Sequence, residues 1–222
     1  MTQKSNANKL SKDTYTSTAE CMKLGLPTEG KKSKQLLFKR FTDFIVSICI
    51  LLALFPLLFV IVIIICLDSP GPAVYRQKRV GRRGNYFQIY KFRTMYMGTP
   101  DLPTSEMQML PTRVTKFGKL LRQTSLDEVP QLFNILKGEM SIVGPRPALY
   151  NQEELTAERL QTGVLEFLPG ITGWAQVNGR DELSDSVKVE LDKWYVDHWH
   201  YFLDWQIIFA TFKAVLSGRG TI

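Results

Sequence analysis

The sequence predicts an α/β fold that is mostly helical, with a small β element and an N-terminal membrane anchor. One observation is an uncharged apolar run over residues 44–67. Another is a pair of short segments, 74–77 and 87–90, whose composition or alternating polarity is typical of strands. Later segments repeat apolar residues at helical spacing. At 222 residues the chain fits one domain plus an anchor.

The apolar run predicts a re-entrant anchor, a helix–break–helix that enters one leaflet and returns. It is about 24 residues long, enough for a straight helix to cross the hydrocarbon core. Pro56 lies in its middle, where it removes a backbone donor and predicts a bend. Positive charge marks the cytoplasmic side, and both flanks are basic. The flanking cations are Lys31, Lys32, Lys34, Lys39, Arg40, Arg76, Lys78, Arg79, Arg82 and Arg83. An ordinary spanning helix is the alternative.

This anchor divides the chain into three expected parts. Residues 1–34 form a disordered polar tail, 35–68 form the anchor, and 69–222 form a domain on the cytoplasmic face with interfacial C-terminal helices. The net charge of +7 predicts an anionic partner, such as acidic lipid, a phosphorylated substrate or nucleic acid. Three cysteines, two of them in the apolar run, form no disulfide or metal framework, which suits a reducing compartment.

Basic residues follow the second predicted strand. Lys91 and Arg93 are two residues apart, so on an extended segment both point to one face. They are either a pair of phosphate-binding residues or solvated charges of a strand.

A pair of adjacent carboxylates, Asp127 and Glu128, precedes a predicted helix that ends at Gly138. Ser125 and Glu128 match a capping box, which would start the helix early. The rival placement puts Pro130 in the first turn. In both placements the carboxylates lie near a helix N-terminus, where we expect anions to bind and carboxylate pKa values to fall.

Two further segments carry candidate binding groups. Arg146 stands between two prolines, which stiffen its backbone and prepare its guanidinium to bind an anion. Residues 167–180 are glycine-rich and predicted to be irregular, so their backbone amides could approach a phosphate or a base. Beyond them, clustered Trp and Tyr and the apolar residues 207–216 predict a helix lying at the membrane interface, with ordinary core aromatics as the alternative.

The chemistry that these residues suggest is phosphoryl transfer. The chain has no Ser/His/Asp order, CxxC pair or Walker loop. Carboxylates among cations suit a phosphorylated substrate with Mg²⁺, and a carboxylate can itself attack phosphorus. Two alternatives remain: a membrane-tethered protein that binds anionic lipid or nucleic acid, and a hydrolase of phosphorylated lipids.

Several motifs, in this order, resemble the bacterial sugar transferases, the monotopic phosphoglycosyl transferases. The resemblance covers about residues 39–216, and its most specific motifs are the longest ones. The motifs are Lys39-Arg with Asp43-Phe, the Pro56-broken run, Tyr90-Lys-Phe-Arg-Thr-Met, Thr124-Ser-Leu-Asp-Glu-Val-Pro-Gln-Leu-Phe-Asn, Gly138-Glu-Met-Ser-Ile-Val-Gly-Pro-Arg-Pro and Pro169-Gly-Ile-Thr-Gly-Trp-Ala-Gln-Val-Asn-Gly-Arg.

The resemblance implies an enzyme that transfers a sugar-1-phosphate from a UDP-sugar to undecaprenyl phosphate and releases UMP. That reaction initiates membrane glycan or glycoconjugate assembly, at the cytoplasmic face of the bacterial inner membrane. The implied partners are the two substrates, the bilayer and Mg²⁺, with no nucleic acid. The sugar, the glycan and the oligomeric state stay open, a homodimer among them.

Roles for individual residues also follow only from the resemblance. Asp127 would be the nucleophile and Glu128 the Mg²⁺ ligand. Lys91, Arg122 and Arg146 would hold phosphate groups, with Arg93 a weaker candidate. The nucleotide-sugar loop would comprise Gly170, Thr172, Gly173, Gln176, Asn178 and Arg180. Relatives often carry Ser before the central Pro, whereas this chain has Phe55, so the bend would depend on Pro56.

Overall fold

The computed structural model describes residues 29–100, 113–179 and 183–216. The chain divides into two compact units, Met1–Arg40 and Phe41–Ile222. In the first unit the described residues are the opening turns of helix α2. The predicted tail is therefore helical from Glu29 onward, and its earlier residues lie outside the described part.

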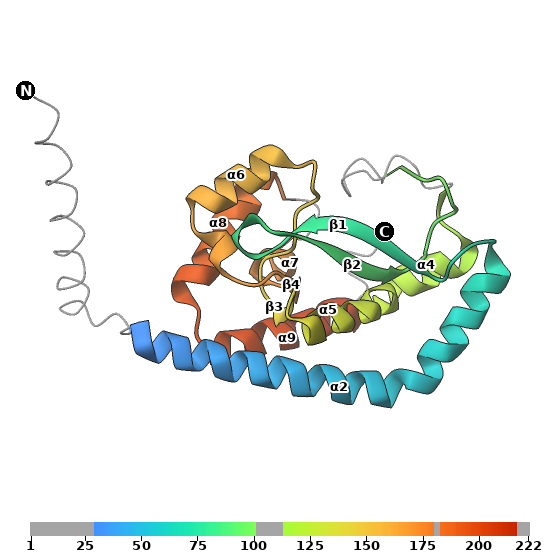
Figure 1. Ribbon diagram of the computed structural model, residues 1–222, viewed down its shortest axis with the longest axis horizontal. Coiled ribbons are helices and arrows are strands. Elements are labelled where there is room, and N and C mark those ends of the chain that lie inside the picture. Colours follow the sequence, from blue (N-terminus) through green and yellow to red (C-terminus); the bar gives the residue numbers. More distant parts are fainter. Residues whose placement is uncertain (1–28, 101–112, 180–182, 217–222) are drawn as a thin grey trace, which may run out of the picture. The chain divides into compact units, whose positions relative to one another are not determined.

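Helix α2, Glu29–Asp68, contains the whole apolar run. It stays helical through Pro56, so the expected break does not interrupt the helix. From Phe41 onward, Figure 1 shows α2 passing beneath α5 and α9 and then turning upward before β1. Within the described residues, 34–68 is the one helical stretch long and apolar enough to cross a membrane. The helix ends at Asp68, and the helix-breaking sequence Ser-Pro-Gly-Pro follows it.

A β-hairpin follows the anchor. Strands β1, Val74–Val80, and β2, Tyr86–Phe92, pair antiparallel with Val74 opposite Phe92. A short 3₁₀ turn, Arg82–Gly84, joins them. The hairpin confirms both predicted strands and makes each of them longer.

The region around the carboxylate pair consists of three short helices. Helix α4, Lys116–Gln123, begins at Thr115, whose hydroxyl accepts the Gly118 N–H at 3.0 Å. A 3₁₀ helix, η3, spans Leu126–Gln131 and leads directly into α5, Leu132–Lys137. Gly138 ends α5 at φ 88°, as predicted.

Two very short strands pair in parallel, and the second of them lies in the segment 167–180 that was predicted to be irregular. Strand β3, Ser141–Val143, lies beside β4, Gly170–Thr172. A Cβ atom on Gly170 would lie 2.1 Å from the backbone nitrogen of Gly144. The glycines of this segment therefore serve close backbone packing, and the expectation of an irregular loop was wrong over 170–177, because helix α7, Trp174–Val177, follows β4.

The C-terminal part is helical, as predicted. Helix α6, Glu153–Gln161, and a 3₁₀ turn, Val164–Glu166, precede α7. Helices α8, Asp185–His198, and α9, Tyr201–Leu216, follow it.

From Phe41 onward, α2 belongs to the second unit and packs into its core at two places. Ile61 and Ile65 are buried with Phe92 and Leu121 in one core cluster. Ile50 and Leu51 pack on a second cluster formed by Ile89, Leu132, Ile135 and Met140. Burial of such a side chain contributes about 1.5–3 kcal/mol. In addition, the Ser141 hydroxyl donates to the buried Asp43 carboxylate at 2.6 Å, which ties α2 to β3.

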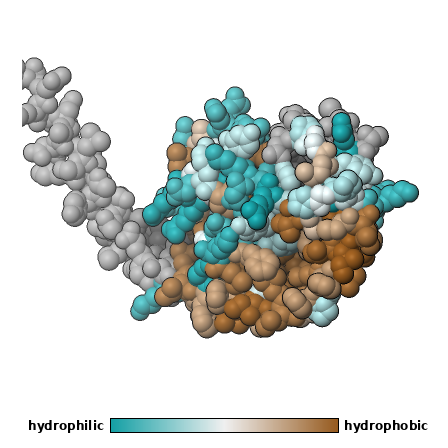
Figure 2. All heavy atoms as spheres, turned by 45° about the vertical axis from the view of Figure 1, so that its right-hand side comes forward, coloured by the Kyte–Doolittle hydropathy of each residue, from teal (hydrophilic) through white to brown (hydrophobic). Residues whose placement is uncertain are grey.

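Large apolar side chains nevertheless remain exposed on α2 and α9. Figure 2 shows hydrophobic residues gathered over the lower side of the molecule and polar residues above them. On α9 the exposed aromatic residues recur every three or four positions, so they form one face of the helix. From Phe41 onward, the most exposed of these side chains on α2 and α9 are Phe41, Leu52, Phe55, Phe59, Leu67, Phe202, Phe209 and Phe212.

Candidate active site

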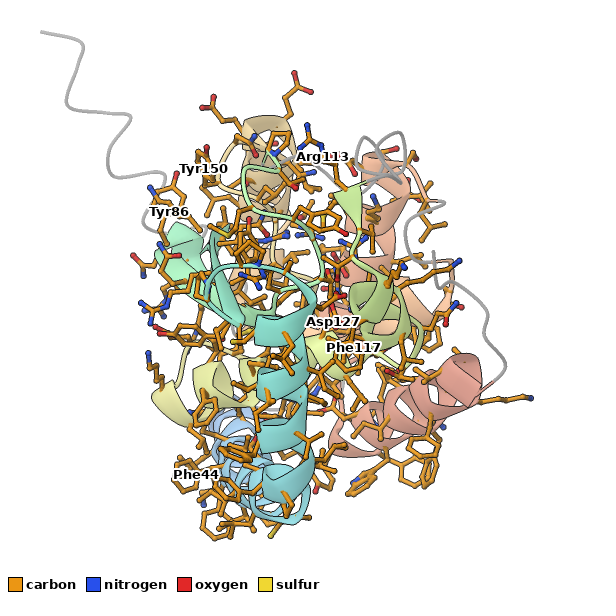
Figure 3. The ribbon with its side chains drawn as sticks, turned by 90° about the vertical axis from the view of Figure 1, so that its right-hand side faces the viewer. Phe44, Tyr86, Arg113, Phe117, Asp127 and Tyr150 are labelled. Carbon is orange, nitrogen blue, oxygen red and sulfur yellow. The ribbon has the colours of Figure 1, made fainter. Side chains whose placement is uncertain are left out.

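Helix η3 presents the two carboxylates. Ser125, just before it, adopts a left-handed conformation at φ 57° and makes no side-chain cap, so the predicted capping box was wrong. Its carbonyl instead accepts the Glu128 N–H at 3.2 Å. Figure 3 shows Asp127 inside the molecule beside Phe117 of α4, at the upper end of the rising part of α2. A left-handed serine is strained, and such strain gathers at functional sites.

Glu128 is held by two cations. One oxygen, Oε1, accepts Lys91 Nζ at 2.8 Å and Arg146 Nη2 at 3.1 Å. Burial alone would raise the pKa of the Glu128 carboxyl, but the charges and hydrogen bonds of Lys91 and Arg146 outweigh it and hold that pKa well below its usual range. The expected fall in carboxylate pKa is therefore found at Glu128, and its cause is this pair of cations.

Asp127 has the opposite electrostatics. Within the described part of the chain its carboxylate accepts no hydrogen bond and forms no ion pair. Burial, and next the charge of Glu128, raise its pKa to about 6, although Lys91, Arg122 and Arg146 oppose the rise. The expectation that both pKa values would fall was wrong for Asp127, because desolvation outweighs the surrounding cations there.

Arg122 and Lys91 complete the charged surroundings of Asp127. Arg122 Nε donates to the Thr94 hydroxyl at 3.0 Å, which fixes the guanidinium on the side of α4. Burial lowers the pKa of both cations, and Asp127 partly opposes the effect. A half-buried cation of this kind interacts strongly with an anion because little water screens the charge.

Arg93 does not belong to this group. Its Nη1 donates to the Pro70 carbonyl at 3.1 Å, and its Nη2 donates to Ser69 at 2.5 Å and Ile65 at 3.2 Å. The side chain is buried and satisfies carbonyls at the C-terminal end of α2. Neither of the two alternatives for Arg93, phosphate binding or a solvated strand charge, fits this placement.

The residues expected to form the nucleotide-sugar loop are largely engaged within the fold. Gly170 and Thr172 belong to β4, and Gly173 precedes α7. Gln176 on α7 and Asn178 just after it also make internal hydrogen bonds. Gln176 Nε2 donates to Ile171 O at 2.8 Å, and Asn178 Nδ2 donates to Trp174 O at 2.8 Å. Arg180 lies outside the described residues.

The donor set around η3 suits a metal ion only in part. No group of three His, Cys, Asp or Glu side chains gathers anywhere in the described residues. Two adjacent carboxylates remain, and Glu128 already accepts both of its cations through a single oxygen. That set fits an Mg²⁺ ion that brings phosphate oxygens as further ligands, since Mg²⁺ is commonly bound through one or two carboxylates.

Sequence reasoning missed several residues that lie outside the site and support it. Arg159 and Asp192 form a buried ion pair at 2.6 Å, and Arg79 donates to the Pro147 carbonyl at 3.0 Å. Arg159 lies on a helix whose sequence is polar and amphipathic. Nothing in the local sequence therefore indicates that the Arg159 side chain is buried. Only the packing of α6 against α8 reveals it.

The sequence of the chain is similar to those of known proteins. A family profile described as "Bacterial sugar transferase" matches residues 34–218. The "Uncharacterized sugar transferase EpsL" of Bacillus subtilis is 42% identical over 187 residues, which cover 83% of this chain and 90% of that protein.

Two similar proteins have names that state an activity. The "UDP-glucose:undecaprenyl-phosphate glucose-1-phosphate transferase" of Klebsiella pneumoniae is 40% identical over 82% of this chain and 41% of its own length. The "Undecaprenyl-phosphate galactose phosphotransferase" of Salmonella typhimurium is 37% identical over 90% of this chain and 45% of its own length. The chain therefore spans less than half the length of either protein.

Proposed function

The chain belongs to the bacterial sugar transferase family, and we propose that it transfers a sugar-1-phosphate from a UDP-sugar to undecaprenyl phosphate with release of UMP. The names of the Klebsiella and Salmonella relatives support this reaction class. The observation that supports this proposal best is the environment of the Asp127 carboxylate. This carboxylate is a half-buried nucleophile without a partner in the described residues, yet it lies within the field of three cations.

In the first step Asp127 attacks the phosphorus that bears the sugar. A bond forms between the carboxylate oxygen and phosphorus, the bond from that phosphorus to the bridging oxygen of the diphosphate breaks, and UMP leaves with the electron pair. The pKa near 6 leaves Asp127 ionised at neutral pH and more basic than an ordinary aspartate, which favours attack.

In the second step a phosphate oxygen of undecaprenyl phosphate attacks the same phosphorus. The bond to Asp127 breaks, and the carboxylate is regenerated. The product is a lipid diphosphate that carries the sugar. Each step forms one bond to phosphorus and breaks one, so the enzyme returns to its starting state.

The cations stabilise the charge that these steps shift onto phosphate oxygens. Lys91 and Arg146 are fixed by Glu128, and Arg122 is fixed by Thr94, so all three are oriented before substrate binds. Glu128, with its pKa held low, stays ionised and keeps Lys91 and Arg146 in place. Mg²⁺ bound to Glu128 and the diphosphate would supply further charge neutralisation.

The apolar face supports the proposal that this chemistry takes place at a membrane. The exposed side chains of α2, together with the aromatic face of α9, form a surface suited to the bilayer interface. We propose that α2 is re-entrant and α9 interfacial, on the cytoplasmic face of the bacterial inner membrane. Asp127 would then lie near the level of the lipid phosphate, so the acceptor need not leave the bilayer.

A screen of UDP-sugars with undecaprenyl phosphate, scored by UMP release in membranes or nanodiscs, tests the function. One UDP-sugar should give turnover that requires the lipid, and Asp127→Asn should abolish it. Sugar released into water would indicate a hydrolase instead. Salt-sensitive binding of nucleic acid, with no turnover of any UDP-sugar, would indicate the binding protein.

A further inference from the structure

The backbone that carries Arg146 is held at four successive carbonyls. Two of the donors are backbone amides and two are arginine side chains from other elements. The contacts are Gly170 N to Pro145 O at 2.9 Å, Arg159 Nη1 to Arg146 O at 2.7 Å, Arg79 Nη1 to Pro147 O at 3.0 Å, and Val80 N to Ala148 O at 2.9 Å.

Arg159 links this segment to a second buried charge. Its Nη1 holds the Arg146 carbonyl, and its Nη2 donates to Asp192 Oδ2 on α8 at 2.6 Å. The two side chains are only 4% and 2% exposed. A buried ion pair is weak evidence for stability, because desolvating two charges opposes their attraction. Its geometry is therefore the more informative property, since one rigid guanidinium serves a carboxylate and a backbone carbonyl together.

We propose that Arg159, oriented by Asp192, is a positioning residue for the transfer reaction, and that it acts by fixing the backbone of Arg146. The Arg146 guanidinium reaches Glu128 from that backbone, so the chain of contacts runs from α8 through α6 to the carboxylate pair. This inference rests on the proposed function, because the anion that Arg146 would orient is the donor diphosphate.

The geometry demands arginine at position 159. The guanidinium presents its donors in a fixed fork, whereas a lysine is a single flexible point charge. Lysine would keep the charge beside Asp192 but could not hold the Arg146 carbonyl in the same arrangement. Arg159→Lys should therefore lower turnover even though the ion pair persists.

The first test replaces Arg159 and Asp192 together. The double variant Arg159→Met/Asp192→Leu leaves no buried charge unpaired and removes only the donor of the Arg146 carbonyl, so its thermal midpoint should fall less than that of either single variant. Its kcat/KM for UMP release should fall about 10- to 100-fold, because a displacement near 1 Å at a positioned group costs that much. The matched control is Lys193→Met/Asp197→Asn, an exposed ion pair on the same helix, which should change neither quantity.

A double-mutant cycle separates positioning from general stability. In an Arg146→Ala background the Arg159→Met/Asp192→Leu change should have little further effect, because its target guanidinium is gone. Equal losses in both backgrounds would overturn the inference, and so would kcat/KM within about threefold of wild type. Arg159→Lys provides the same comparison if the double variant does not fold.

Hydrogen exchange provides a readout that does not depend on activity. In the double variant, peptides covering residues 143–150 should exchange faster than in wild type, while those from α9 should not change. Unchanged exchange over 143–150 would contradict the inference. If wild type releases no UMP from any UDP-sugar, the proposed function fails, whereas the exchange result still decides whether Arg159 fixes the segment.

Discussion

Two neighbouring carboxyl groups with opposite pKa shifts define the site at the scale of residues. Asp127 and Glu128 share the same 3₁₀ helix, yet only Glu128 has hydrogen-bonded cations in the described residues. Burial raises the pKa of Asp127, and ion pairing lowers that of Glu128. Paired carboxylates whose pKa values move apart typically have different roles. Here Asp127 is suited to attack phosphorus, and Glu128 is suited to hold Lys91 and Arg146 in place.

The pKa of Asp127 predicts a pH dependence for the first step. Only the ionised carboxylate attacks, so UMP release in a single turnover without lipid should rise with pH and level off above an inflection near 6. In Glu128→Gln the inflection should move to lower pH, because the charge that raises the pKa is gone. A flat profile between pH 5 and 8, or an unmoved inflection in the variant, would contradict this assignment.

The same shift predicts the stability of Asp127→Asn. A pKa raised from 3.8 to about 6 on folding means that the folded protein binds more protons than the unfolded chain in this range. Asp127 therefore weakens stability as pH rises from about 4 to 6, and the neutral variant avoids this loss. At pH 8 the variant should be more stable by about 1–3 kcal/mol, and at pH 4 the difference should vanish.

Thermal unfolding at both pH values measures this difference. Asp197→Asn, at an exposed position on α8, is the control and should stay within about 0.5 kcal/mol of wild type. A variant Asp127→Asn less stable than wild type at pH 8 would show that the cations, and not burial, dominate at this position.

Short elements hold these residues in place at the scale of secondary structure. Strand β2 carries Lys91, η3 carries the carboxylates and α4 carries Arg122. The buried Asn134 joins α5 to β2, because it accepts the Tyr90 N–H at 3.1 Å and donates to Gln88 O at 2.7 Å. Arg93, only two residues after Lys91, instead donates to the carbonyls of Ser69 and Pro70, just after α2 ends. Neighbouring arginines and lysines thus serve different purposes.

Arg93→Met and Arg122→Met should separate these purposes. The Arg93 variant removes the guanidinium donors from the carbonyls of Ile65, Ser69 and Pro70, so unfolding should become easier by about 1–3 kcal/mol while the KM for the UDP-sugar stays unchanged. The Arg122 variant should lower kcat about 100-fold with little loss of stability. Thermal midpoints and steady-state kinetics of both variants provide the measurement, and the reverse pattern would return Arg93 to the phosphate-binding set.

The sequence predicted much of this arrangement where the signal is local. The hairpin, the C-terminal ends of α2 and α5, and the C-terminal helices follow from alternation, breakers and helical spacing. Lys91, Arg122 and Arg146 were named from motifs, and the structure gathers them around Asp127. Long-range packing could not be predicted. The β3–β4 pairing, the burial of Arg159 and the desolvation of Asp127 each depend on segments far apart in the chain.

At the scale of the whole molecule, the part of α2 that begins at Phe41 is built into the core of the second unit. From Phe41 onward α2 contributes Ile61 and Ile65 to a core shared with β2 and α4, while its other side chains stay exposed and apolar. An anchor packed into the core fixes the depth of the site more firmly than a flexible tether. Because α2 continues through Pro56, a direct measurement is needed of whether the helix crosses the bilayer or returns to the same side.

Cysteine labelling tests that path. In a background without native cysteines, Lys34→Cys and Arg82→Cys should both react from the cytoplasmic side with a membrane-impermeant reagent, because both flanks of the anchor are basic. A variant that retains only Cys49, within the apolar run, should stay unlabelled. Labelling of Lys34→Cys from the opposite side would show that α2 spans the bilayer.

The covalent role of Asp127 is the central claim, and trapping the intermediate tests it most directly. The enzyme is incubated with the UDP-sugar that supports turnover, without the lipid acceptor, then quenched, digested and analysed by mass spectrometry. We predict a phospho-sugar adduct on the peptide that contains Asp127, lost on addition of undecaprenyl phosphate and absent from Asp127→Asn. A wild-type enzyme that releases UMP in the presence of lipid but never carries the adduct on that peptide would contradict the account.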